Sequence, residues 1–165
     1  EAVKPTLESL VKHSKSLSLN SGCIYLNADV LPGPGQSRAA MDPDEFIQIC
    51  QDVLCANQEL KDVSFYSLGW SIDRRSYENY NDGHVDEMVT LIQRYNLEDS
   101  GIVLALNARV LVENCSPFDR FLSEFSSSQL LVWTGSREPP ISQNKIDAIK
   151  KHFELKGTSD RIGFD

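Results

Sequence analysis

Apolar residues along the chain recur with two alternating patterns, one typical of β-strands and one typical of amphipathic helices. Strand-like apolar runs fall at residues 23–30, 63–70, 102–112, 129–135 and 161–165. Segments with apolar residues three or four positions apart lie between them, at 42–60, 84–96, 116–127 and 139–157, and another precedes the first strand at 5–17. The pattern therefore predicts one helix, four strand–helix units and a closing strand.

This alternation predicts an α/β fold with a parallel sheet, because parallel strands are joined by right-handed helical crossovers. Two architectures fit: an open doubly wound sheet, and strands four to eight of a TIM-type (β/α)8 barrel. We favour the barrel, because the pattern starts with a helix that lacks its preceding strand and stops on a strand that lacks its covering helix. Residues 1–165 are then a single unit, the C-terminal half of a barrel domain and a mature or cut piece of a longer protein.

Polar or indole side chains follow each predicted strand, at the end where ligands bind in both architectures. These candidate pocket residues are Asn27, Asp29, Trp70, Asn107, Arg109, Trp133, Thr134 and Asp165. Asn27 and Asp29 share one strand face, which points into the barrel on the favoured prediction. A buried carboxylate needs a cation or several hydrogen-bond donors, so Asp29 is either a metal ligand or part of a structural pair.

The other candidates also have two interpretations each. Trp70 and Trp133 either stack on a ligand or close the end of a core, and for large aromatic residues the second is commoner. Arg109 either holds an anionic group or pairs with Asp29. The histidines fall on helices or their caps, and none of the familiar nucleotide-binding or nucleophile motifs is present. The sequence therefore assigns no catalytic residue.

Composition narrows the class of protein. The formal net charge of -8 argues against nucleic-acid binding driven by broad electrostatics. The four cysteines, Cys23, Cys50, Cys55 and Cys115, either form two disulfides in a secreted protein or are scattered buried thiols. Asn114, followed by Cys115 and Ser116, fits the N-glycosylation pattern, which weakly favours an extracellular protein.

Four segments resemble the menorin family, in the same order and over nearly the whole chain: LNADVLPGPG (26–35), MDPDEFIQIC (41–50), FYSLGW (65–70) and LLVWTG (130–135). The resemblance implies a TIM-barrel type related to glycerophosphodiester phosphodiesterases and phospholipase-C-like enzymes. It also implies an extracellular, secreted or membrane-associated protein. The founding type patterns dendrite branches as an epidermal cue, together with an L1-type cell-adhesion molecule and a leucine-rich-repeat neuronal receptor.

The enzyme relatives bind a divalent metal and use histidine acid–base chemistry from strands that this chain does not contain. Of the matched motifs, only Asn27, Asp29, Trp133 and Thr134 carry over. The sequence departs from relatives where Ser71-Ile72-Asp73 replaces Thr-Thr-Gly and where Asn107 replaces an arginine. Both departures weaken the enzyme interpretation.

We therefore expect a non-catalytic extracellular recognition glycoprotein for cell adhesion and dendrite morphogenesis, which needs no cofactor and stays with the N-terminal half of the barrel. One alternative is a metal-dependent glycerophosphodiester phosphodiesterase-like hydrolase in which Asp29 assists the metal. The other is a barrel that binds a small ligand without turnover.

Overall fold

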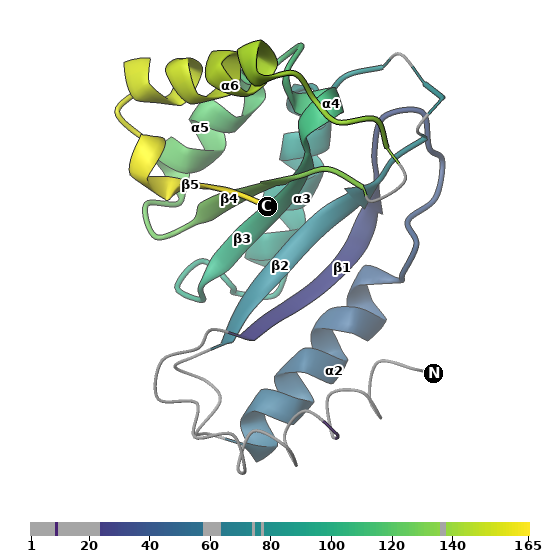
Figure 1. The fold of residues 1–165 in the computed structure, drawn as a ribbon. Coiled ribbons are helices and arrows are strands. Elements are labelled where there is room, and N and C mark those ends of the chain that lie inside the picture. Colours follow the sequence, from purple (N-terminus) through teal and green to yellow (C-terminus); the bar gives the residue numbers. More distant parts are fainter. Residues whose placement is uncertain (1–8, 10–23, 58–63, 74, 77, 136–137) are drawn as a thin grey trace.

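The computed structural model describes residues 9, 24–57, 64–73, 75–76, 78–135 and 138–165 (Figure 1). Apart from Ser9, which is helical, the predicted helix at 5–17 lies outside the described residues, as does Cys23. Among the described helices, none has the length and apolar character needed to cross a membrane.

The described strands form one parallel sheet in the order β1-β2-β3-β4-β5, so strands that are neighbours in sequence are also neighbours in space. The strands are β1 (Ile24–Pro32), β2 (Ser64–Ser71), β3 (Ile102–Asn107), β4 (Gln129–Trp133) and β5 (Ile162–Phe164). The helical elements are α2 (Pro43–Ala56), α3 (Asp82–Arg94), α4 (Ala108–Leu111), α5 (Pro117–Glu124), α6 (Gln143–Leu155) and the 3₁₀ turn η2 (Ser159–Arg161). The prediction of a parallel α/β fold is confirmed.

The strand order bears on the two predicted architectures. A doubly wound sheet reverses its strand order at a switch point and carries helices on both faces. Here the order never reverses, and right-handed crossovers then place the connecting helices on a single face. We call this the helix face and the opposite one the site face. This winding is that of consecutive strands in a (β/α) barrel.

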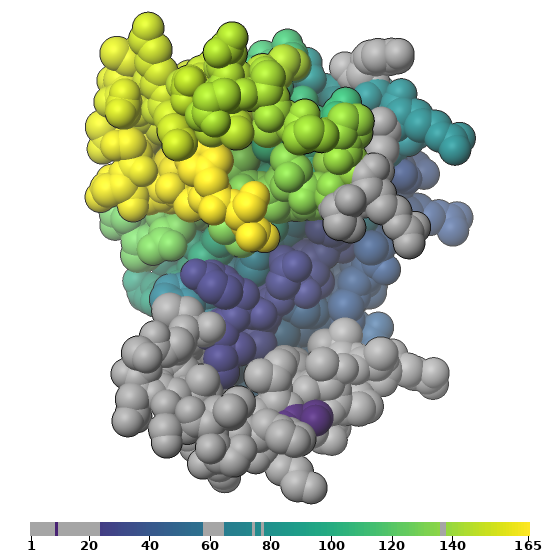
Figure 2. Space-filling model, in the orientation of Figure 1, coloured from purple at the N-terminus to yellow at the C-terminus, as the bar shows by residue number. Residues whose placement is uncertain are grey.

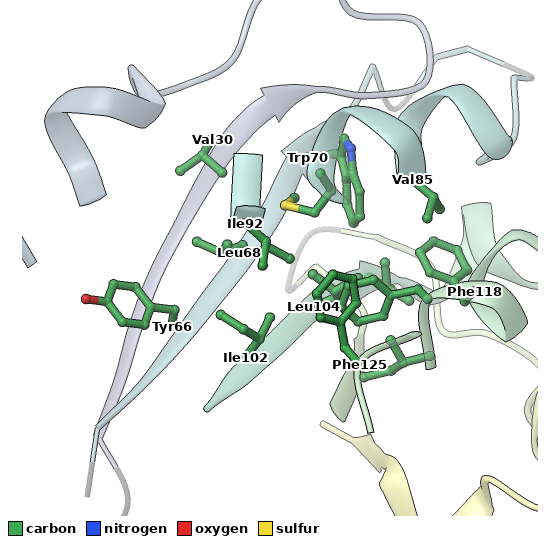
Figure 3. Close-up of a cluster of buried hydrophobic side chains, with 14 of the residues drawn as sticks. Val30, Tyr66, Leu68, Trp70, Val85, Ile92, Ile102, Leu104, Phe118 and Phe125 are labelled. Carbon is green, nitrogen blue, oxygen red and sulfur yellow. The ribbon is translucent and has the colours of Figure 1, made fainter. Parts of the chain in front are cut away.

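The hydrophobic core lies between the helix face and the helices (Figure 3). Alternate strand residues such as Val30, Leu68 and Leu104 point into it and are fully buried. Trp70 and Phe118 pack there as well, with ring centroids 6.0 Å apart. On the site face, by contrast, Tyr25 remains 49% exposed, and Figure 2 shows side chains of β1 at the molecular surface.

The helix N-termini follow from local sequence. Asp42 caps α2 by accepting a 2.9 Å hydrogen bond from the Glu45 N–H, and Pro43 begins the helix. Asn81 and His84 cap α3 reciprocally, because each side chain accepts from the backbone N–H of the other residue. Each cap fixes where the chain leaves a loop at the carboxyl end of a strand.

The prediction of one continuous strand over 102–112 is wrong. β3 ends at Asn107, and residues Ala108–Leu111 form the short helix α4. The Asn107 side-chain oxygen accepts a 3.0 Å hydrogen bond from the Arg109 N–H, so Asn107 acts as an N-cap that turns the chain into a helix. Apolar residues continue past the turn because α4 also packs against the hydrophobic core. Leu111 of α4 is fully buried in that core.

The Pro-Gly-Pro-Gly segment after β1 contacts the loop after β2 instead of only turning the chain. The Gly33 N–H donates to the Ser71 carbonyl at 2.8 Å, and the Asp73 N–H donates to the Pro34 carbonyl at 3.0 Å. The Gly35 N–H donates to Glu78 Oε2 at 2.9 Å. The pairing of β1 with β2 is therefore extended beyond both strands.

Arg161 attaches the C-terminal segment to the end of α5. Its Nε donates to the Ser128 carbonyl at 2.8 Å, and Nη1 donates to the Leu122 carbonyl at 2.7 Å. Nη2 donates to the Phe125 carbonyl and to Ser128 Oγ. Carbonyls at a helix C-terminus lack intrahelical donors, and a cation there is also favoured by the helix dipole.

Two of the cysteines are buried thiols. Cys50 and Cys115 form no disulfide, and burial raises the pKa of Cys50 to about 12 and that of Cys115 to about 11. Cys115 Sγ donates to the Leu111 carbonyl at 3.4 Å. The prediction of buried thiols is therefore confirmed for Cys50 and Cys115. The alternative prediction, in which all four cysteines form two disulfides, is wrong.

Candidate functional site

Asp29 lies on the site face near the carboxyl end of β1. It is paired in register with Gly69 of β2, and the register shifts immediately after it, between Asp29 and Leu31. A Cβ placed on Gly69 would lie 2.6 Å from Asp29 Oδ1, so the carboxylate rests over the bare backbone of β2. Glycine at position 69 therefore makes the space that this carboxylate occupies.

The Asp29 carboxylate is half-buried and has no hydrogen bond or ion pair from any residue in the described ranges. Burial alone raises its pKa above the ordinary value of 3.8. In particular, Arg109 does not pair with it, because Arg109 lies on α4 and its Nη1 donates to the Pro139 carbonyl at 3.3 Å. The proposed structural pair is thus absent among the described residues.

We expect Asp29→Asn to raise the free energy of unfolding at pH 7 by roughly 1 kcal/mol, because it removes the cost of burying an unpaired charge. Since the folded-state pKa is raised, the native protein binds the proton more tightly than the unfolded chain. Stability contributed by this group is therefore fully present below pH 3.8 and is lost as pH rises through the folded pKa. Urea unfolding of both proteins between pH 4 and pH 8 measures the difference.

Asp86→Asn is the matched control, since Asp86 is an exposed carboxylate that is ion-paired with Arg120. That substitution should leave stability unchanged or slightly lower. Destabilisation by Asp29→Asn at pH 7 would contradict an unpaired carboxylate.

Asn27 is held by its neighbour on β2. Ser67 Oγ donates to Asn27 Oδ1 at 3.0 Å, and Ser67 is 2% exposed. The hydrogen bond fixes the orientation of the Asn27 amide and leaves its NH₂ group as a donor on the site face. The two polar residues of β1 thus differ, because Asn27 has a partner and Asp29 does not.

A second polar group joins the ends of β3 and β4. Asn107 is buried, its N–H donates to Tyr80 Oη at 3.3 Å, and its Nδ2 donates to Glu138 Oε2 at 3.0 Å. The Gly135 N–H also donates to Glu138 Oε2, at 3.1 Å. Burial raises the pKa of Tyr80, and the negative charges of Asp29 and Glu138 add to this, so its hydroxyl stays protonated.

Tyr80 and Glu138 were not predicted as site residues. Tyr80 directly precedes the Asn81 cap of α3, the position from which a hydrophobic staple packs onto the helix, and that signal could have marked it as buried. Glu138 lies in the loop between β4 and α6, which has no apolar pattern, so nothing in the sequence indicates its partner.

The structure gathers some of the predicted residues and separates others. Trp133 is half-buried on the site face, in register with Asn107, and Thr134 follows it. Asp165 is exposed beyond β5, where its N–H donates to the Val132 carbonyl at 3.0 Å. Trp70 points the other way, into the core of the helix face, where it is 1% exposed.

The glycosylation candidate Asn114 is only partly exposed. Its Nδ2 donates to the Tyr80 carbonyl at 3.1 Å, and its Oδ1 accepts from Ser116 Oγ at 2.7 Å. Attachment of a sugar to Nδ2 would need this contact with Tyr80 to rearrange.

The described residues do not by themselves fit a divalent metal. Nowhere in the described ranges do three His, Cys, Asp or Glu side chains come close enough together to hold an ion. Asp29, the predicted metal ligand, would supply one carboxylate of the several oxygen ligands that Mg²⁺ or Ca²⁺ takes. No reaction step through a metal follows from this arrangement.

The fold defines a parallel α/β protein with a singly wound sheet and with polar side chains near the ends of its strands. Residues 1–158 match the family model for the menorin N-terminal domain, and the chain belongs to the menorin family. It is 26% identical over 151 residues to "Protein FAM151B" of Homo sapiens, an alignment that covers 91% of this chain and 49% of the relative. The chain thus spans about half the length of the curated relative that it matches. No solved structure gives a significant match.

Proposed function

We propose that this protein is an extracellular, secreted or membrane-associated menorin-type recognition protein, a cue or co-ligand in a cell-adhesion receptor complex that patterns neuronal dendrites, without catalysis. Membership of the menorin family carries the proposal. It is supported by the chemistry of the site face, because in the described ranges Asp29 does not belong to any group of three His, Cys, Asp or Glu side chains that could hold a metal ion. The partners proposed by resemblance are an L1-type cell-adhesion molecule and a leucine-rich-repeat receptor.

We also propose that strands four to eight of a (β/α)8 barrel are present here and that an N-terminal half of the same barrel completes it. β1 is nine residues long and, among the described strands, pairs only with β2, so its outer edge offers a long row of backbone hydrogen-bonding groups. Tyr25 of β1 is exposed on the site face, beside this edge. If residues 1–165 alone form a soluble monomer that melts cooperatively, the proposal that a second half completes the barrel is contradicted.

Binding experiments test the recognition role. The full-length protein, immobilised, is expected to bind the ectodomain of an L1-type adhesion molecule, and to bind the leucine-rich-repeat ectodomain more tightly once the first partner is present. Biolayer interferometry with each ectodomain alone and with both measures this coupling. Absence of binding to either ectodomain, by protein that melts cooperatively, would overturn the proposal.

A metal-dependent phosphodiesterase-like hydrolase is the second candidate, and the unpartnered Asp29 favours it. A half-buried carboxylate at a strand end, whose pKa is raised by burial, is a candidate functional group. The full-length protein would be assayed with glycerophosphodiesters in Mg²⁺ and in Ca²⁺. Turnover that Asp29→Asn abolishes would replace the recognition role with the enzyme.

A further inference from the structure

A hollow of about 1040 Å³ opens beyond the carboxyl ends of β2, β3 and β4. Its walls come from the loop after β2, from α4 and from the segment between β4 and α6, and Figure 1 shows these segments at the same end of the sheet. We call it the rim hollow. Its volume is at the upper end of the range found for small-ligand sites.

The carboxylates that line the rim hollow are already engaged by donors of the protein. Asp73 accepts from the Arg75 N–H at 2.9 Å, Glu78 from the Gly35 N–H at 2.9 Å, Glu113 from Lys145 Nζ at 2.9 Å, and Glu138 from Asn107 Nδ2 at 3.0 Å. These acceptors are used to hold the walls in place. A carboxylate can accept further hydrogen bonds, but among the described residues no three of these side chains come close enough together to hold a metal cation.

The two arginines of the rim hollow have donors to spare. A guanidinium carries five N–H donors. Arg109 uses one of them, for the Pro139 carbonyl, and neither it nor the Arg75 side chain forms an ion pair with a carboxylate among the described residues. Both side chains are exposed, so their remaining donors face solvent.

The remaining lining limits what an incoming anion can be. The lining contains three cationic residues and four carboxylates, so a ligand with several negative charges would be repelled. Ile72, Val110 and Ile141, together with Pro139 and Pro140, supply apolar surface beside the arginines. A single planar carboxylate matches the fork of a guanidinium, and an apolar body would cover these side chains.

We propose that the rim hollow binds one carboxylate carried on an apolar body, with Arg109 and Arg75 as the residues that recognise the charge. The carboxylate would belong either to a small organic acid or to a polypeptide. This binding site goes beyond the recognition role proposed above and depends neither on receptor binding nor on catalysis.

Hexanoate, hexanamide and inorganic phosphate are the probes, titrated into the full-length protein and followed by saturation-transfer NMR and calorimetry. We expect hexanoate to bind at least about tenfold more tightly than hexanamide, because the amide cannot form the charge-assisted pair. Arg109→Gln should weaken hexanoate binding by a similar factor, with Arg75→Gln as a second variant. Arg94→Gln is the matched control, since Arg94 pairs with Asp44 and does not line the hollow.

A peptide used as a fourth probe distinguishes the two sources of the carboxylate. Acetyl-Leu-Glu-Leu-amide that binds more tightly than hexanoate would assign the site to a polypeptide, and the reverse order would assign it to a small acid. Equal affinity for hexanoate and hexanamide would overturn the proposal. Unchanged binding by both arginine variants, or tighter binding of phosphate than of hexanoate, would overturn it as well.

Discussion

Replacing Phe118 with alanine is expected to lower the free energy of unfolding by about 3–5 kcal/mol. Phe118 is fully buried, and its ring centroid lies 5.4 Å from that of Tyr80 and 6.0 Å from that of Trp70. Both contacts are edge-on, the geometry in which aromatic pairs add to simple burial. The truncation would leave a cavity between α5 and the sheet, lined by large rings that cannot collapse into it.

Urea unfolding at equilibrium measures this loss, and Phe164→Ala is the matched control. Phe164 is 39% exposed at the end of β5 and contacts Lys150 through its ring face. Its replacement should cost roughly 1 kcal/mol or less, because little buried surface and one exposed cation–π contact are lost. Similar losses for the two variants would show that Phe118 is not at the centre of the core.

Gly33→Ala is expected to destabilise the protein by about 1–3 kcal/mol, near the upper end of that range. An added Cβ would lie 2.6 Å from Trp70 Cβ and 2.9 Å from the Ser71 carbonyl oxygen. Neither neighbour is the far end of a flexible side chain, so the backbone of the loop must shift. That shift would weaken the hydrogen bond from the Gly33 N–H to Ser71.

Gly163→Ala separates this crowding from the general effect of adding a methyl group to a strand or loop. A Cβ there would meet Leu131 Cδ1 at 3.5 Å, an ordinary van der Waals contact. We expect a change within about 0.5 kcal/mol. Thermal melts and urea titrations of both variants measure the difference. If the Gly33→Ala protein is as stable as Gly163→Ala, the segment at Gly33 can move away from the end of β2 without loss of stability.

The order of strands and helices could be predicted from the sequence because each element has a clear apolar period. The boundary at Asn107 could not be predicted as easily, since the apolar residues on either side of it fit a strand as well as a strand followed by a short helix. Trp70 ends a predicted strand, and of its two interpretations the structure supports the commoner one, in which it closes the end of a core. Alternation along β2 puts it with Leu68 on the helix face.

The candidate site was predictable only in part. Asn27, Asp29 and Asn107 interrupt apolar runs, and a polar residue in such a run needs an explanation in the fold. The partners of Asn27 and Asn107, Ser67 and Glu138, are 40 and 31 positions away in sequence. Contacts of that range depend on strand register and loop conformation, which a single sequence does not reveal.

The attachment of Arg161 to the end of α5 also has a consequence for local unfolding. β5 contains only three residues, so its few ladder hydrogen bonds give weak protection against opening. The four hydrogen bonds of one guanidinium hold the segment instead, and all of them end on residues of α5 or the turn after it. η2 and β5 would therefore open and close together with the C-terminal end of α5, as one cooperative unit separate from β1 and β2. An added strand at the outer edge of β5 would stabilise that unit first.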